Sequence, residues 1–84
     1  MDMLKIIGEN VREFRKIKGY SQEALAKHST FKRSYIGDVE RGERNMTIET
    51  LIQLATALDV QAPVLLIEGA YKWFRPAKRT HGQK

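Results

Sequence analysis

The chain has 84 residues and a mass of 9.7 kDa, with 42% hydrophobic and 30% charged residues. This balance predicts one small globular domain, without a separate sensing or catalytic domain. There is no cysteine, which excludes disulfides and cysteine-containing zinc sites, and the formal net charge of +5 favours an anionic partner.

Several other classes of protein are excluded in the same way. The longest apolar run, residues 62–67, is far shorter than the roughly 20 residues that cross a bilayer, and no secretion signal opens the chain. We therefore expect a cytoplasmic protein that does not insert into a membrane. His28 and His81 are too far apart to suggest a metal site, and no catalytic triad or glycine-rich phosphate loop is present. Neither a cofactor nor an enzymatic activity is expected.

Positive charge is unevenly distributed along the chain. Residues 71–84 contain five basic residues and no acid, residues 1–45 contain ten basic and seven acidic residues, and residues 46–70 contain three acids and no base. We expect phosphate contacts from the basic first half of the domain.

Five segments in succession have the pattern of helices. They span residues 4–18, 22–28, 32–41, 48–58 and 63–68. Apolar residues recur at helical spacing in the first four, and Ser21 and Thr47 stand where N-cap side chains accept from the first amides. No alternating pattern predicts a strand. The prediction is an all-α domain of five helices over residues 1–70, followed by a basic tail over residues 71–84.

The second and third predicted helices have the dimensions of a helix-turn-helix, whose second helix can enter the major groove of DNA. Ala26 is small where the two helices would cross, while Ile36 and Val39 would anchor the second helix on the core. The same spacing fits any helical hairpin, so DNA binding needs support from the residues between these anchors.

Three motifs in a fixed order provide that support: YSQEALA, RSYIGDVERG and TIETLIQLATALDV. Over residues 7–60 the chain resembles the helix-turn-helix family of phage repressors, Cro proteins and the controller proteins of restriction-modification systems. The resemblance implies a compact lambda-repressor-like fold and a transcriptional regulator that binds operator DNA as a homodimer. A controller protein that regulates its own promoter and that of an endonuclease is the first expectation, because no sensor domain is predicted.

Other functions remain open. A phage Cro-like repressor and an antitoxin of similar fold, which would also bind a toxin, share the same motifs. A protein-interaction module without DNA affinity would lack salt-sensitive binding to duplex DNA. An activator would also contact RNA polymerase, and no residue pattern identifies a surface for that contact.

The resemblance assigns base contacts to the third predicted helix. Lys32, Arg33 and Ser34 occupy its first turn, which reaches base edges when such a helix docks. Arg33 is the expected main reader, because arginine suits a bidentate contact to guanine. Asp38 either accepts a hydrogen bond from a cytosine amino group or holds Arg33 or Arg41 in place. The alternative for the whole turn is a solvated basic surface.

Phosphate contacts are expected around this helix, from Gln22, Tyr35, Arg41, Arg44 and Asn45. Tyr35 fits a partly buried core residue equally well. Arg44 and Asn45 lie in the loop that reaches the minor groove in similar proteins.

A buried ion pair is expected between Arg15 and Glu40, because these positions join the first and third helices in similar proteins. Removing one partner of such a pair costs about 3 to 5 kcal/mol, since the other charge stays buried and unpaired. The alternative is two solvated surface charges. In neither case is a contact with DNA expected.

The dimer interface is expected on the fifth helix, at Val64 and Ile67, with help from the fourth helix, unless both residues belong to the core. Aromatic residues at the start of the tail, Tyr71, Trp73 and Phe74, are expected to pack on the dimer. The positive charges after Pro76 either add non-specific DNA affinity or are solvated.

Two residues depart from the family pattern. Thr30 stands at a turn position usually taken by glycine, and a β-branched residue suits a left-handed conformation poorly. The turn is then either rearranged or strained, and Thr30→Gly is expected to stabilise the fold. Gly37 lowers the helix propensity of its segment by about 1 kcal/mol relative to alanine. Either a close approach of the backbone to DNA or simple tolerance explains it.

Overall fold

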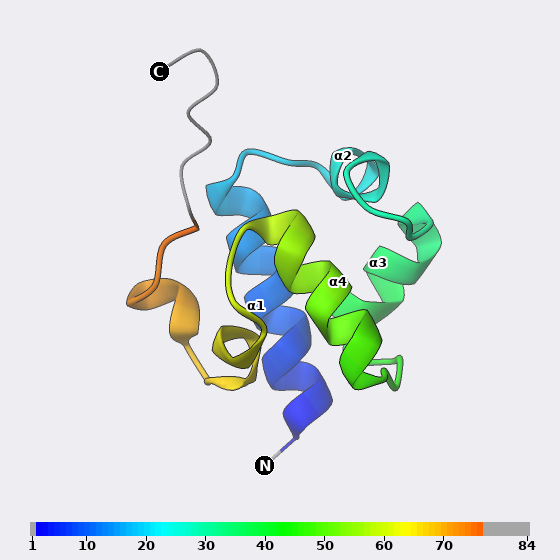
Figure 1. Cartoon of the computed structure of the whole chain (residues 1–84). Helices are drawn as coiled ribbons and strands as arrows, with labels where there is room; N and C mark the ends of the chain where they lie inside the picture. The colour runs from blue at the N-terminus through cyan, green and yellow to red at the C-terminus, as the bar shows by residue number, and fades with distance from the viewer. Residues whose placement is uncertain (1, 77–84) are drawn as a thin grey trace, which may run out of the picture.

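A computed structural model describes residues 2–76, and within them the chain forms four α-helices and two short 3-10 helices (Figure 1). The elements are α1 (Met3–Ile17), α2 (Gln22–Lys27), α3 (Arg33–Glu40), α4 (Ile48–Leu58), η1 (Ala62–Leu66) and η2 (Ala70–Lys72). The all-α prediction is confirmed. No helix in this part of the chain is both long and apolar enough to cross a membrane.

Side chains at the helix starts explain where most of the α-helices begin. Asp2, Ser21 and Thr47 each accept a hydrogen bond from the amide three residues later, at 3.3, 2.9 and 3.1 Å. The N-caps predicted at Ser21 and Thr47 are confirmed. Lys32 precedes α3 without such a side-chain bond, so α3 begins without a side-chain cap.

The core lies where the four α-helices meet. Each α-helix contributes at least one fully buried large side chain, among them Phe14, Leu25, Ile36, Leu54 and Leu58. The residues predicted to anchor α3, Ile36 and Val39, are both buried. Burial of these apolar side chains provides the main favourable term in folding.

The backbones of α1 and α3 approach each other closely at Gly8. A Cβ atom at residue 8 would lie 2.4 Å from the carbonyl oxygen of Val39 and 2.9 Å from that of Glu40. Both contacts are with backbone atoms, which cannot rotate away as a side chain can. Any side chain at residue 8 would therefore push the end of α3 away from α1.

The prediction of a fifth α-helix is wrong, because η1 is a 3-10 helix. The amides of Val64 and Ile67 donate to the carbonyl three residues earlier. Pro63 supplies no amide hydrogen. Asn10, buried in α1, donates from Nδ2 to the carbonyl oxygens of both Leu65 and Ile67, each at 2.9 Å. The short segment is thus held by a side chain from α1 instead of by further helical turns.

The start of the predicted tail packs against the domain. The expected boundary between residues 70 and 71 falls inside η2. Tyr71 contacts the core, and its hydroxyl donates to Glu9 Oε2 at 2.9 Å, which raises the pKa of Tyr71 above its ordinary value. Trp73 is 81% exposed. The expectations for positions 77–84 lie outside the described residues.

The turn between α2 and α3 is rearranged and not strained at Thr30. Among the described residues other than glycine, only Asp59 has a positive φ. Ser29 holds the turn instead: its hydroxyl donates to the carbonyl of Ala26 and accepts from the amide of Phe31, both at 3.2 Å. The left-handed conformation considered for Thr30 is therefore wrong, and so is the reason to expect stabilisation by Thr30→Gly.

Thr30→Gly is now expected to lower the free energy of unfolding by about 0.5 to 1 kcal/mol, because glycine gives the unfolded chain more freedom. Thermal denaturation followed by circular dichroism measures the change. Thr30→Ala serves as the control and should lie between glycine and threonine. A higher midpoint for the glycine variant would show that threonine strains the turn.

Gly8→Ala should lower the free energy of unfolding by about 1 to 3 kcal/mol through overpacking, although alanine is the better helix former. Urea denaturation measures the loss. Lys16→Ala, on an exposed position of the same helix, is the matched control and should be nearly neutral. If Gly8→Ala were as stable as the original chain, the close contact between α1 and α3 would not exist in solution.

Candidate nucleic-acid interface

The first turn of α3 is open to solvent. Lys32, Arg33 and Ser34 are all exposed, with Lys32 directly before the helix. In Figure 1, α2 and α3 lie on one side of the molecule and the chain from η1 to η2 on the other. Three of the four residues predicted to contact bases therefore lie together on one accessible turn, and the fourth, Asp38, lies one turn further along α3.

An ion pair joins the end of α3 to α1. Arg15 donates from Nε to Glu40 Oε2 at 2.6 Å and from Nη2 to Glu40 Oε1 at 3.1 Å, while Nη1 donates to the carbonyl of Tyr20 at 2.9 Å. The exposed fractions of the Arg15 and Glu40 side chains are only 12% and 5%. This bidentate ion pair is shielded from water and restricts the position of α3 relative to α1.

Gln22, at the start of α2, belongs to the same network. Its side-chain amide donates to Glu40 Oε1 at 3.0 Å. An amide nitrogen carries two hydrogens, so Gln22 keeps a second donor for a phosphate oxygen. A cavity of about 260 Å³ opens beside it and is lined by Arg12, Arg15, Gln22, Gly37, Glu40 and Arg41. Three arginines and one glutamate surround this polar hollow, and Glu40 is paired with Arg15.

Gly37 makes room for a neighbouring side chain. A Cβ atom at residue 37 would lie 3.3 Å from Nη1 of Arg41 and 3.8 Å from Oε1 of Gln22. The absence of a side chain lets Arg41 lie against α3. This is a reason for the glycine that the two sequence-based explanations did not include.

Asp38 is paired with two arginines. Its Oδ1 accepts from Nη2 of Arg41, and its Oδ2 accepts from Nη2 of Arg44 at 3.3 Å. Arg41 also donates from Nε to Glu43 at 3.0 Å. The hydrogen bond to Glu43, supported by the charge of Asp38, raises the pKa of Arg41 above its ordinary value. Of the two roles expected for Asp38, the structure contains the contact with Arg41.

Tyr35 is half-buried and packs against the core. The Tyr35 ring stacks on the ring of Phe31, with the ring centroids 5.0 Å apart. The guanidinium carbon of Arg44 lies 4.9 Å from the centroid of the Tyr35 ring. Asn45, next in the loop, is exposed. The residues expected to contact phosphates thus surround α3, and Arg44 is held on the helix by both a ring and a carboxylate.

Two members of this cluster escaped the sequence analysis. Glu43 stands between Arg41 and Arg44, and this alternation of charges could have indicated a local ion pair. Phe31 lies before the start of α3, and its stacking on Tyr35 depends on the course of the turn and not on a helical spacing. Within residues 2–76, no three histidine or acidic side chains are grouped closely enough to hold a metal ion.

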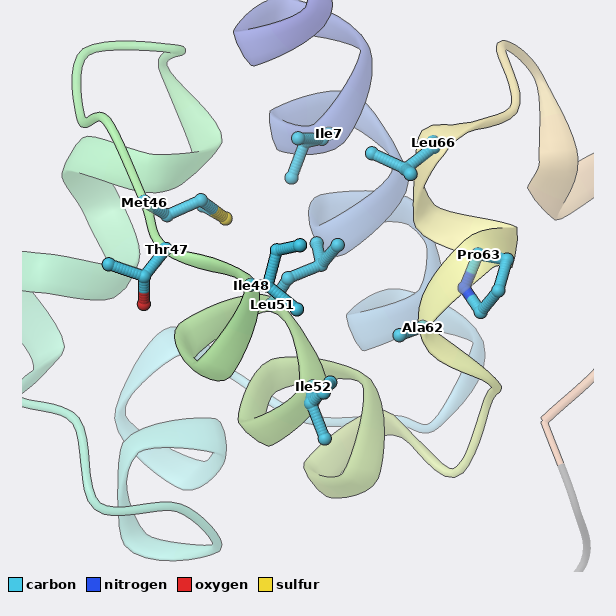
Figure 2. A pocket seen from close by; sticks show the side chains of 9 residues that line it. All are labelled: Ile7, Met46, Thr47, Ile48, Leu51, Ile52, Ala62, Pro63 and Leu66. Atoms are coloured by element: carbon cyan, nitrogen blue, oxygen red, sulfur yellow. The ribbon is translucent and has the colours of Figure 1, made fainter.

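The two residues expected at a dimer interface differ in their surroundings. Val64 is half-buried against the core, whereas Ile67 is 45% exposed. A separate apolar cavity of about 510 Å³ lies between α4 and η1 (Figure 2). Its lining consists of Ile7, Met46, Thr47, Ile48, Leu51, Ile52, Ala62, Pro63 and Leu66. Ile48 and Ile52 remain 75% and 50% exposed and both line this cavity, so they form part of one apolar patch on the surface.

Known proteins resemble this chain along most of its length. The control protein C.SmaI of Serratia marcescens is 51% identical over 72 residues, which cover 86% of each chain. The restriction-modification controller protein C.AhdI from Aeromonas hydrophila has 48% identity and a TM-score of 0.70, covering 74% of this chain and 94% of that chain. The controller protein C.Esp1396I, solved as a tetramer in complex with its natural 35 base-pair operator, has 34% identity and a TM-score of 0.70, covering 77% and 86%.

The sequence profile of the helix-turn-helix family matches residues 11–65, which include the whole of α2, α3 and α4. The matched range also includes the exposed residues Lys32, Arg33 and Ser34. On this match and these similarities, the chain belongs to the helix-turn-helix family.

Proposed function

We propose that this chain is a sequence-specific DNA-binding transcriptional regulator, a controller protein of a restriction-modification system that acts in the cytoplasm as a homodimer. The observation that carries the proposal is the exposed first turn of α3, held in place by the buried pair of Arg15 and Glu40. The similarity to C.SmaI over 86% of both chains favours a controller over a phage Cro-like repressor or an antitoxin. No catalytic activity is proposed.

In this proposal α3 enters the major groove with its first turn against the base edges. Arg33 forms the bidentate contact with a guanine, and Lys32 and Ser34 contact bases or phosphates beside it. Gln22 and the side chains after α3, Arg41, Arg44 and Asn45, bind phosphates of the DNA strands on either side of the groove. The anionic backbone would then face the arginine-lined cavity.

A second copy of the chain is proposed to cover the apolar cavity between α4 and η1. The exposed side chains Ile48, Ile52 and Leu66 gather there, and a symmetric dimer would bury each set against the other. The tetrameric state of C.Esp1396I on its operator supports assembly of this kind. Of Val64 and Ile67, the two residues expected at the interface, Ile67 is exposed and follows Leu66 in the chain, so it can take part in the same contact.

The function is tested by titrating the protein onto DNA from immediately upstream of its own gene, at two salt concentrations, with random duplex as competitor. Tight binding that survives the competitor is expected. Binding that vanishes equally from both DNAs as the salt rises would mean electrostatic attachment without sequence recognition, and would contradict the proposal.

Arg33→Ala should weaken binding to the upstream DNA by about 10- to 100-fold, since a bidentate arginine contact discriminates by roughly 1 to 3 kcal/mol. Fluorescence anisotropy with a labelled duplex measures the loss. Arg75→Ala removes the same charge from an exposed position outside α3 and is the matched control. Equal losses for the two variants would show that Arg33 acts only through its charge.

Ile52→Glu should convert the dimer to a monomer and weaken operator binding, because a charge would be buried in the apolar interface. Sedimentation velocity measures the mass. Ile17→Glu is the control, since Ile17 is 43% exposed and does not line the cavity. A dimer that persists in the Ile52 variant would place the interface elsewhere.

A further inference from the structure

One acidic side chain lies inside the basic surface that is proposed to meet DNA. Asp38 is on α3 itself, one turn after Ser34. Both of its carboxylate oxygens are occupied, Oδ1 by Arg41 and Oδ2 by Arg44. The two arginine side chains are 58% and 50% exposed, so solvent and DNA can reach them.

Each of these arginines has a second contact that limits its freedom. Arg44 lies over the ring of Tyr35, 4.9 Å from its centroid, and that ring is stacked on Phe31. Arg41 donates to Glu43 at 3.0 Å. Both guanidiniums are therefore held beside α3 by carboxylates before any DNA arrives.

This pairing bears most heavily on non-specific binding. Attraction between cations and phosphates supplies nearly all of the affinity for random DNA. An arginine that is already paired with a carboxylate contributes less to that attraction. Exposed ion pairs are weak, so a site that offers well-placed partners can take the arginines over.

We propose that Asp38 is a specificity determinant of the DNA complex: it keeps Arg41 and Arg44 from non-specific phosphates and releases them to a matching operator. The inference rests on the proposed function. Asp38 then acts through Arg41 and Arg44 instead of contacting cytosine directly, so it is a positioning residue.

The test compares Asp38→Asn with the unchanged chain on the upstream duplex and on a random duplex of equal length, over a series of salt concentrations. Random-duplex affinity should rise roughly tenfold near 0.1 M salt, and its salt slope should steepen by about one, because freed arginines release further counterions. Affinity for the upstream duplex should change by less than about threefold, because the loss of the carboxylate that positions the arginines offsets the saved cost of breaking the two ion pairs. The ratio of the two affinities therefore falls. Circular dichroism verifies that the variant is folded.

Two further variants serve as controls. Glu68→Gln removes one negative charge from an exposed position outside α3 and should leave the affinity ratio unchanged. Asp38→Glu keeps the carboxylate and should retain most of the ratio, which a role in packing alone would not explain. If Asp38→Asn fails to fold, a folded Asp38→Glu chain still tests the proposal. A loss of the affinity ratio in this variant, although the carboxylate is retained, would contradict the role given to the carboxylate.

Three outcomes would overturn the inference. A large loss of upstream affinity with unchanged random-duplex affinity would mean that Asp38 reads a base directly. Equal gains on both duplexes would mean a simple change of net charge. If the unchanged chain does not prefer the upstream duplex, the proposed function fails independently of this inference. The measurements on the random duplex still test the pairing of Asp38 with the two arginines. An unaltered salt slope in Asp38→Asn would then contradict an effect of that pairing on DNA binding.

Discussion

The ion pair between Arg15 and Glu40 is the contact on which the geometry of the surface proposed to bind DNA depends. Glu40 ends α3 and accepts hydrogen bonds from Arg15 of α1 and from Gln22 at the start of α2. Close beside it, Gly8 lets the backbone of α1 approach that of α3. The ion pair and the close packing thus fix the same end of α3. Because α3 is rigid, the orientation of the exposed first turn at its other end is fixed as well.

Two different surfaces then follow from one small core. Around α3 the surface is charged, and arginines are arranged by carboxylates and by an aromatic ring. Between α4 and η1 it is apolar, with large side chains left exposed. Asn10 connects the second surface to α1 by donating to two carbonyls at the end of η1. A domain of this size can therefore combine DNA contact and self-association without a second core.

Local sequence signals predicted most of the helices but not their exceptions. The apolar spacing and the caps at Ser21 and Thr47 are local, and α1 to α4 began and ended within about two residues of the prediction. The 3-10 form of η1 depends on Asn10, 55 residues from Leu65 in the chain, which no local pattern reveals. The turn at Thr30 depends on the rotamer of Ser29. At the interface, residue types indicated which side chains are basic, whereas the pairing of Asp38 with two arginines required the fold.

The central claim is that α3 and the loop after it form the surface that binds DNA, while η1 and η2 do not. An NMR titration of the labelled protein with the upstream duplex tests this most directly, because amide shifts report each residue separately. The account predicts the largest changes at residues 32–35 and 41–45 and near Gln22, with little change at residues 69–76. Largest changes at residues 69–76, or small changes spread evenly over the chain, would contradict it.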